Sequence, residues 1–327
     1  DELHPRFSWT LSAMNDSDYG QKQTSYRILV SRSLTKLQKN MGDMWDTGWI
    51  TSDRMQLIEY KGNPLLSDKT YYWKVCVKDE KGQQSAWSDS SQWSTGLFSQ
   101  FDWSAKWIGT SQLFDPSQRE CNVEDPWLRK TININERPDK ATMFVASVGY
   151  HELYVNGIKI GDHVLAPAVS DHTRRARYIA YDIAKALKPG KNVISIWLGA
   201  SWSIYAPYIT PDKPRTPIVI AQADVYNSKG KKISRIITDN SWKTHSSPNK
   251  LLGTWEFGNY GGEIYDANKE IEGWNTIGYN DSSWDQAIEY ASKLTLSAQK
   301  METNKLFEEI NPISIEERAD GTYRVDM

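Results

Sequence analysis

Residues 153–160, LYVNGIKI, place an Asn-Gly pair between two short runs in which apolar and polar residues alternate. Such alternation is typical of strands with one buried face, and Asn156-Gly157 suits a two-residue hairpin because both turn positions need positive φ. Residues 193–198, VISIWL, are apolar on both faces, which predicts a strand in the middle of a sandwich, covered on both sides. We therefore expect residues 141–202 to form the core of a β-sandwich domain.

On the N-terminal side, residues 1–97 show the short-strand pattern of a smaller sandwich. Tyr26, Ile28 and Val30 alternate along one expected strand, and residues 71–77 alternate along another. Turn residues separate these runs at a spacing typical of fibronectin-like and Ig-like sandwiches, and no helix of ordinary length is indicated. Residues 98–106, FSQFDWSAK, are aromatic rather than rich in Gly and Ser, which predicts a packed linker.

Residues 107–300 contain the hairpin and are expected to form the larger domain, a jelly-roll β-sandwich with long loops between its strands. In one loop, residues 201–216, repeated prolines remove ladder donors. The same loop carries Trp202 and Tyr205, so it is the first candidate for a functional rim. Residues 301–327 form a short tail of one or two strands around an Asp-Gly turn at 320–321. The predicted fold class is all-β throughout.

The charge balance argues against two classes of partner. Thirty-nine Lys and Arg against 41 Asp and Glu give a net charge of −2, whereas nucleic-acid binding needs a basic stripe and membrane-surface binding a basic patch. No apolar run reaches the roughly 20 residues of a membrane span. Fifteen Trp and 17 Tyr suit an all-β protein and favour a carbohydrate ligand, although most of these rings are expected to fill cores. Cys76 and Cys121 are interpreted as two free thiols rather than a disulfide.

Four motifs, in order, resemble the N-terminal region of bacterial alpha-L-rhamnosidases, glycoside hydrolase family 78. They are WSAKWIG at 103–109, the region from VGYHELYVNGIKIGD to LGASW at 148–202, YGGEIYDA at 260–267 and GYNDSSWDQA at 278–287. The resemblance implies a parent enzyme that hydrolyses terminal alpha-L-rhamnosyl residues of glycans or glycosides by inversion, with water as the nucleophile. It also implies that residues 107–300 are a carbohydrate-binding-like domain and that residues 301–327 open a further, truncated β domain. The expected compartment is the periplasm or the cell exterior.

The same resemblance implies that this chain contains no catalytic residue, because the family's acid and base belong to a helical toroid further downstream. The expected partners are the protein's own C-terminal catalytic domain and rhamnose-containing oligosaccharides or glycosides. From the residues alone, Glu263 and Asp266 are the most tempting carboxylate pair for glycoside hydrolysis, but a role in holding loop amides explains them better. We expect this portion to scaffold the catalytic domain and to bind sugar.

Aromatic platforms with nearby carboxylates and amides are the candidates for sugar binding. Trp202 follows three small residues and is the first candidate, with Tyr205 beside it, and core burial of Trp202 is an equal alternative. Asp171 begins a run with three Arg that also fits an ordinary solvated cluster. The remaining candidates are Asn156, which is also explained as a turn residue, Glu263 and Asp266.

Calcium is the one cofactor that such a sandwich allows, since it takes several oxygen ligands, but no residue pattern requires it. The five His show no zinc-ligand spacing. Two other functions fit the same sequence: a free-standing carbohydrate-binding or adhesion module without catalysis, and a purely structural spacer. A parent gene that continues into a long helical region excludes the first, and measurable sugar affinity excludes the second.

Overall fold

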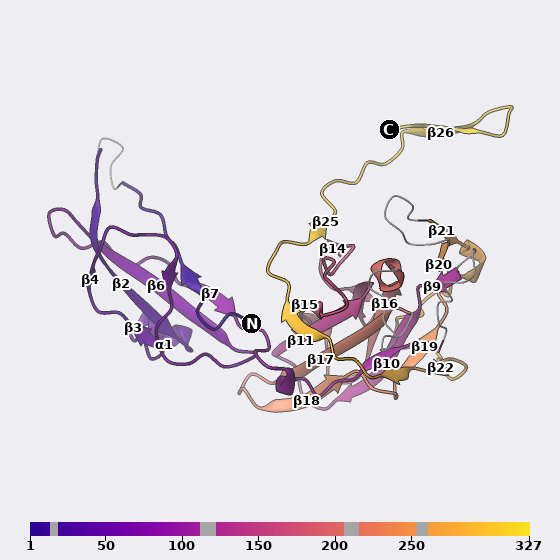
Figure 1. The fold of residues 1–327 in the computed structure, drawn as a ribbon, viewed down its shortest axis with the longest axis horizontal. Helices are drawn as coiled ribbons and strands as arrows, with labels where there is room; N and C mark the ends of the chain where they lie inside the picture. Colours follow the sequence, from indigo (N-terminus) through magenta and orange to yellow (C-terminus); the bar gives the residue numbers. More distant parts are fainter. Residues whose placement is uncertain (14–18, 112–121, 206–215, 253–260) are drawn as a thin grey trace. The chain divides into compact units, whose positions relative to one another are not determined.

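The chain divides into two units, Asp1–Ser104 and Ala105–Met327, in the computed structural model of Figure 1. The structure describes residues 1–13, 19–111, 122–205, 216–252 and 261–327. Their regular structure is mostly β-sheet, and the helix α1 (Leu34–Gln38) spans five residues. None of the helices in these ranges is long and apolar enough to cross a membrane. The predicted all-β fold, a smaller sandwich followed by a larger one, is confirmed, while the jelly-roll connection of the larger one stays a prediction.

The smaller unit is built on a long antiparallel pair, β2 (Gln23–Ser31) with β6 (Thr70–Asp79). The strands that extend this sheet are β3 (Trp45–Asp46), β4 (Ile50–Thr51) and β7 (Ser91–Ser94). A second layer consists of β1 (Arg6–Phe7) paired with β5 (Ile58–Glu59). Phe7 and Ile58 share one apolar cluster with Tyr26, Ile28 and Val30. The alternating residues predicted to share a face of β2 are therefore the ones that join the two layers.

The first half of the predicted linker, residues 98–106, is tied to the smaller unit by a carboxylate. Ser99 and Asp102 form a capping box around η1 (Gln100–Asp102). Asp102 Oδ2 also accepts hydrogen bonds from Ser67 Oγ at 2.7 Å and from Phe98 N at 3.1 Å, whereas the Phe101 ring is exposed. Hydrogen bonds to Asp102, more than packing of the Phe101 ring, hold residues 98–102 in place.

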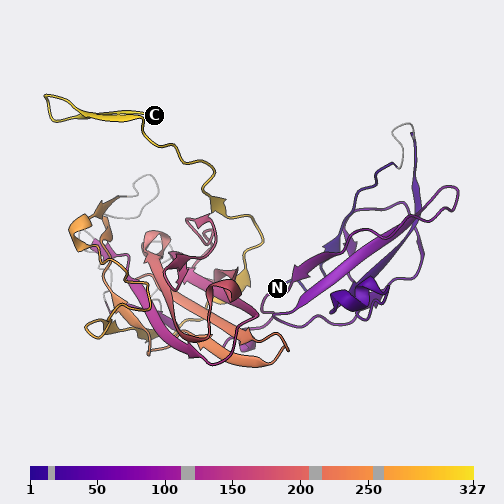
Figure 2. The same cartoon turned by 180° about the vertical axis from the view of Figure 1, so that it is seen from behind.

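The two largest sheets of the larger unit appear in Figures 1 and 2. Side chains from both sheets form one apolar core. Within the described ranges, one sheet has six strands in the order β13 (Ile158–Lys159), β12 (Tyr150–Val155), β16 (Gly190–Gly199), β10 (Trp127–Ile134), β19 (Lys243–His245) and β22 (Asp285–Gln286). The other, of seven, has the order β23 (Ile288–Tyr290), β8 (Trp107–Gly109), β17 (Ile218–Tyr226), β11 (Lys140–Val148), β15 (Arg175–Asp182) and β24 (Thr295–Ala298), with β18 (Lys232–Ile237) on β17. Leu153 and Ile196 of the first sheet meet Met143 and Ala221 of the second in this core.

The strand predicted to lie in the middle of the sandwich does so. β16 pairs with β10 on one side and with β12 on the other, and residues 192–196 are buried on both faces. The predicted hairpin joins β12 to β13, with φ of 53° at Asn156 and 88° at Gly157. Both signals are local, because alternation and turn chemistry involve neighbouring residues.

A cluster of indole rings covers the outer face of the six-stranded sheet. Trp127 of β10 stacks on Trp274, with centroids 4.5 Å apart and an interplanar angle of 10°, and Trp284 joins the same cluster. The guanidinium of the buried Arg129 donates to Asp281 Oδ2 at 2.8 Å and to the Thr276 carbonyl. Because a buried cation needs acceptors, Arg129 locks residues 271–284 over β10.

Smaller strand pairs complete the larger unit. Three strands form a separate sheet, namely β9 (Asn122–Glu124), β20 (Asn249–Leu252) and β21 (Gly262–Tyr265). β14 (His163–Val164) forms a long-range antiparallel pair with β25 (Asn304–Lys305), and β26 (Ser314–Glu317) forms a hairpin with β27 (Tyr323–Asp326). Since β24 and β25 lie on either side of residue 301, strand pairing continues across the predicted boundary there. Where a further domain begins stays a prediction.

Candidate functional site

Trp202 lies in η3 (Ser201–Ile204), shortly after the end of β16, and Tyr205 is the C-cap of η3. Their rings meet edge to face with centroids 5.2 Å apart, and both side chains are partly buried. Trp202 Nε1 donates a hydrogen bond to Tyr150 Oη at 3.1 Å, which orients the indole at the start of β12. An indole held by its N–H, with part of its surface open, has the properties of a stacking platform. The rest of the predicted rim, residues 206–215, lies outside the described residues.

Close contact between two glycines sets the backbone beneath these rings. Gly149 has φ of 101°, and a Cβ there would lie 2.3 Å from the Gly199 carbonyl oxygen. Only glycine accepts both conditions without strain. The approach lets Tyr150 pack against Gly199. Gly199 therefore serves the packing of Tyr150, the residue that orients the Trp202 ring.

Asp171 belongs to the same end of the larger sandwich. β11 and β15 pair antiparallel through Ala146 and Tyr178, so the start of β15 lies beside the end of β11, just before Tyr150. Asp171 Oδ1 accepts hydrogen bonds from the N–H and the hydroxyl of Thr173, which fixes the turn into β15. With 47% of its side chain exposed, the carboxylate is accessible to a ligand.

Glu263 lies at the same end of the larger sandwich, on the small three-stranded sheet. It lies opposite Leu251 of β20, and Leu251 packs with Ala200 and Ile204 around η3. Its negative charge also acts on Asp125, a buried residue between β9 and β10. Burial is the main cause that raises the pKa of Asp125 to about 6, and Glu263 adds to it. Asp125 is not among the residues predicted from the sequence, because an Asp-Pro pair before a strand has the signature of an ordinary turn.

Asn156 and Asp266 hold turns, and the structure separates Asn156 from the ring pair. Asn156 follows the far end of β12 from Tyr150. Its Nδ2 donates to the Ala186 carbonyl and its Oδ1 accepts from Val193 N, both at 2.8 Å. Asp266 caps η5 (Ala267–Lys269) by accepting a hydrogen bond from Asn268 N at 3.2 Å. The structure therefore brings Trp202, Tyr205, Asp171 and Glu263 to one end of the sandwich and leaves Asn156 at the other.

A buried chain of polar side chains, which no local sequence pattern indicates, starts beside Gly149. His151 Nδ1 lies 2.8 Å from Ser147 Oγ, and Nε2 lies 3.0 Å from Tyr181 Oη. Ser147 Oγ donates to the Gly149 carbonyl, so the consistent assignment has His151 Nδ1–H donating to Ser147 and the Tyr181 hydroxyl donating to Nε2. Burial lowers the pKa of His151 to about 3. The imidazole is thus neutral, and both of its nitrogens have partners.

No three His, Cys, Asp or Glu side chains converge in the described part of the chain. Calcium also takes backbone and amide carbonyl oxygens as ligands. The calcium ion considered from the sequence therefore stays a prediction. Cys76 is buried with a free thiol, and Cys121 lies outside the described residues.

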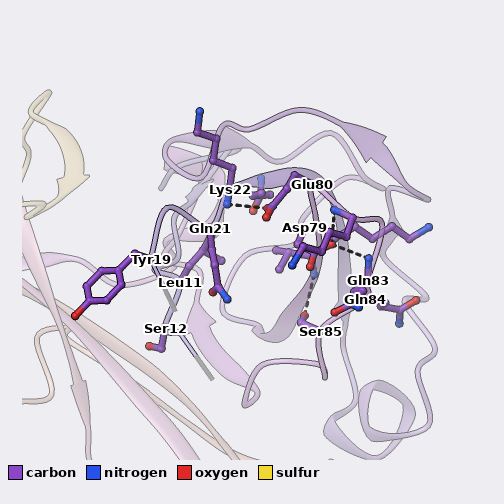
Figure 3. A pocket seen from close by; sticks show the side chains of 14 residues that line it. Leu11, Ser12, Tyr19, Gln21, Lys22, Asp79, Glu80, Gln83, Gln84 and Ser85 are labelled. Carbon is purple, nitrogen blue, oxygen red and sulfur yellow. Dashed lines mark hydrogen bonds between the residues drawn. The ribbon is translucent and has the colours of Figure 1, made fainter. Parts of the chain in front are cut away.

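The smaller unit has a surface pocket of about 640 Å³ near the end of β6 (Figure 3). Its carboxylates already hold backbone groups: Glu80 Oε2 accepts from Lys22 N at 3.1 Å, and Asp79 Oδ1 accepts from Gln83 N at 2.7 Å. The Tyr19 ring extends away from these groups in Figure 3 and is 89% exposed. The polar groups of this pocket thus close a turn, and we assign no ligand to it.

The arrangement of these residues defines the class of protein. Two β-sandwich units are present, and the more promising of the candidate sites is a ring pair with flanking carboxylates. The two carboxylates weighed for glycoside hydrolysis, Glu263 and Asp266, lie on an exposed strand and a helix cap. The chain is therefore a protein of two β-sandwich units with a candidate binding surface at one end of the larger unit.

Comparison with protein families identifies both units. Residues 136–308 match the family described as alpha-L-rhamnosidase N-terminal domain, and residues 1–99 match the Rha78A-like, N-terminal immunoglobulin domain. The chain belongs to the alpha-L-rhamnosidase N-terminal domain family. The resemblance drawn from the four motifs is thereby confirmed.

Individual relatives align along nearly the whole chain. An alpha-L-rhamnosidase of Formosa agariphila is 32% identical over 347 residues, covering 99% of this chain and 36% of the relative. One from an Alteromonas species is 31% identical over 299 residues, covering 89% of this chain and 31% of the relative. The solved structure of an alpha-L-rhamnosidase from Dictyoglumus thermophilum has a TM-score of 0.86 and 34% identity, covering 100% of this chain and 36% of that one. The chain thus spans about a third of the length of these relatives.

Proposed function

We propose that this chain is the non-catalytic N-terminal part of an alpha-L-rhamnosidase that hydrolyses terminal alpha-L-rhamnosyl residues of glycans or glycosides. The observation that carries this proposal is the alignment of nearly the whole chain with about a third of the length of proteins named alpha-L-rhamnosidase. Its partners are then the protein's own C-terminal catalytic domain, which it scaffolds, and rhamnose-containing oligosaccharides or glycosides. The corresponding compartment is the periplasm or the cell exterior.

Within this role, the end of the larger sandwich around Trp202 is the proposed sugar-binding surface. The partly open indole offers an apolar face for the C–H groups and the methyl group of a rhamnosyl ring. The carboxylates of Asp171 and Glu263, which the topology brings to the same end, are acceptors for sugar hydroxyls. Asn156 and Asp266 have no part in this surface.

Calorimetric titration of the chain 1–327 with L-rhamnose and rhamnosylated oligosaccharides tests the binding step. We expect millimolar or tighter affinity in the wild type, lost in Trp202→Ala and kept in Trp49→Ala, which removes a partly buried indole of the smaller unit. Unfolding curves of both variants control for folding. Absence of heat with every sugar leaves the chain as a scaffold alone, and equal affinity in Trp202→Ala shows that the surface is wrong.

An activity assay tests the non-catalytic assignment. The chain 1–327 is expected to release no product from an aryl alpha-L-rhamnoside, and turnover by this chain alone would show that it contains the catalytic groups. The alternative, a free-standing carbohydrate-binding module, shares the binding step but has no catalytic partner. Hydrolysis by the full-length gene product excludes that alternative.

A further inference from the structure

Asp125, between β9 and β10, binds the C-terminal end of β16 and the residue that follows it. Its side chain is 4% exposed, and one carboxylate oxygen accepts a hydrogen bond from Ala200 N at 2.5 Å while the other accepts from Asn249 Nδ2 at 2.5 Å. Its carbonyl oxygen accepts from Trp197 Nε1 at 3.1 Å. The backbone of Asp125 therefore binds Trp197 of β16, and its side chain binds Ala200, which precedes η3.

The backbone that Asp125 holds leads directly to the Trp202 ring. Ala200 precedes η3, and Ser201 has φ of 38°, a left-handed value that a non-glycine residue keeps only when its surroundings impose it. The buried hydroxyls of Ser201 and Ser203 have no hydrogen-bond partner in the described part of the chain, so they do not impose it. The carboxylate on Ala200 N is placed to do so.

Burying the Asp125 carboxylate has a desolvation cost that its hydrogen bonds must offset. Removing an ionised group from water is unfavourable, which is why burial raises the pKa of Asp125 to about 6. Asn249 of β20 and Ala200 face it as neutral donors, and Glu263 faces it from β21 as a second negative charge. The compensating gain is a charge-assisted bond to one backbone N–H, stronger than a neutral acceptor provides.

We propose that Asp125 is a positioning residue for the sugar-binding surface: its carboxylate fixes the strained Ala200–Ser201 backbone and thereby the Trp202 ring. This inference rests on the function proposed above. It predicts that sugar affinity depends on a residue that does not itself contact the sugar. It also predicts that affinity weakens as Asp125 gains a proton below about pH 6, because a neutral carboxyl is the weaker acceptor.

Exchanging the two partners tests the proposal in the full chain. Asp125→Asn keeps an oxygen for Ala200 N but turns a donor toward Asn249, and the double variant Asp125→Asn/Asn249→Asp restores a donor and an acceptor in reversed order. We expect L-rhamnose affinity to fall roughly tenfold in the single variant and to recover at least partly in the double variant. Hydrogen exchange of the peptide 199–205 should become faster in the single variant and slow again in the double one. Asp182→Asn is the matched control, since Asp182 Oδ1 accepts from Ala184 N ahead of η2 (Ala184–Ala186) at the other end of β15.

The outcomes separate the two ideas. If the wild type binds no L-rhamnose, the proposed sugar-binding surface and this inference both fail, and the chain keeps its scaffold role alone. If the wild type binds and Asp125→Asn binds equally well with unchanged exchange at 199–205, only the inference fails. Should the single variant not fold, the double variant decides: affinity and exchange at 199–205 that both return toward the wild type support the inference, and wild-type affinity with exchange at 199–205 that stays fast overturns it.

Discussion

Replacing His151 by Gln removes the buried imidazole bonded to Ser147 and Tyr181 and leaves a side chain that cannot titrate. The pKa of His151 is lowered by burial to about 3 in the folded protein, against about 6.5 in an unfolded chain. A lowered pKa means that the neutral ring stabilises the fold fully above pH 6.5 and that this contribution is lost as the pH falls toward 3. The free energy of unfolding of the wild type, relative to His151→Gln, should fall by about 2 kcal/mol between pH 6.5 and 4.5.

The comparison with a variant is needed because Asp125 titrates in the opposite sense. Its pKa is raised to about 6, so its contribution to stability is present below the unfolded pKa and is lost as the pH rises through about 6. The two effects oppose each other between about pH 4 and 6 and flatten the wild-type profile. Both proteins in the comparison retain Asp125, so their difference isolates His151.

Hydrogen exchange of peptides covering residues 141–155, measured at increasing urea, reports on the larger unit alone. This matters because two units need not unfold in one step. Tyr181→Phe is the control: it removes the donor to His151 Nε2 and should cost about 1 kcal/mol while keeping the acid dependence. Parallel pH profiles of the wild type and His151→Gln would show that the folded imidazole takes up protons as readily as the unfolded one, and our hydrogen-bond assignment would be wrong.

Two further changes should lower the thermal stability of the larger unit. Gly149→Ala places a Cβ 2.3 Å from the Gly199 carbonyl oxygen at φ of 101° and should lower the free energy of unfolding by about 3 kcal/mol or more. The control Gly230→Ala, with open space around the new Cβ, should lower it clearly less. Similar losses in both variants would contradict the close contact between Gly149 and Gly199. Asp281→Asn removes the charge opposite the buried Arg129 and should cost about 2 kcal/mol, below the usual value for a buried pair because Asp281 is partly exposed. Denaturation midpoints measure both, and an unchanged midpoint in Asp281→Asn would mean that Arg129 finds sufficient acceptors in backbone carbonyls.

The parts of the fold that follow from neighbouring residues could be predicted from the sequence. Alternation placed the strands, the Asn156-Gly157 pair placed the hairpin, and a two-sided apolar run placed β16 in the middle of its sheet. The indole cluster on the outer face was not predictable, because Trp127 and Trp274 are far apart in the sequence and no periodicity links them. Long-range contacts of this kind depend on how the chain crosses the sheet.

In the candidate site, too, residues that are neighbours in the sequence could be predicted and long-range contacts could not. Trp202 and Tyr205 were found together because they are neighbours in one loop. Asn156 was included for its residue type, but its amide is occupied by the Ala186 carbonyl and the Val193 N–H, which only the closed hairpin shows. Asp125 was missed because its partner, Ala200, is 75 positions away.

The short parallel strand β24 has a consequence for self-association. It pairs with β15 from Thr295 beside Arg175 to Ala298 beside Tyr178 and so covers an edge of the seven-stranded sheet. An uncovered β15 would present a row of unpaired N–H and C=O groups, which act as a template for strands of other molecules. A shortened chain that ends before residue 295 should therefore keep its apolar core but aggregate through β15, so that four residues outside that core govern the solubility of the larger unit.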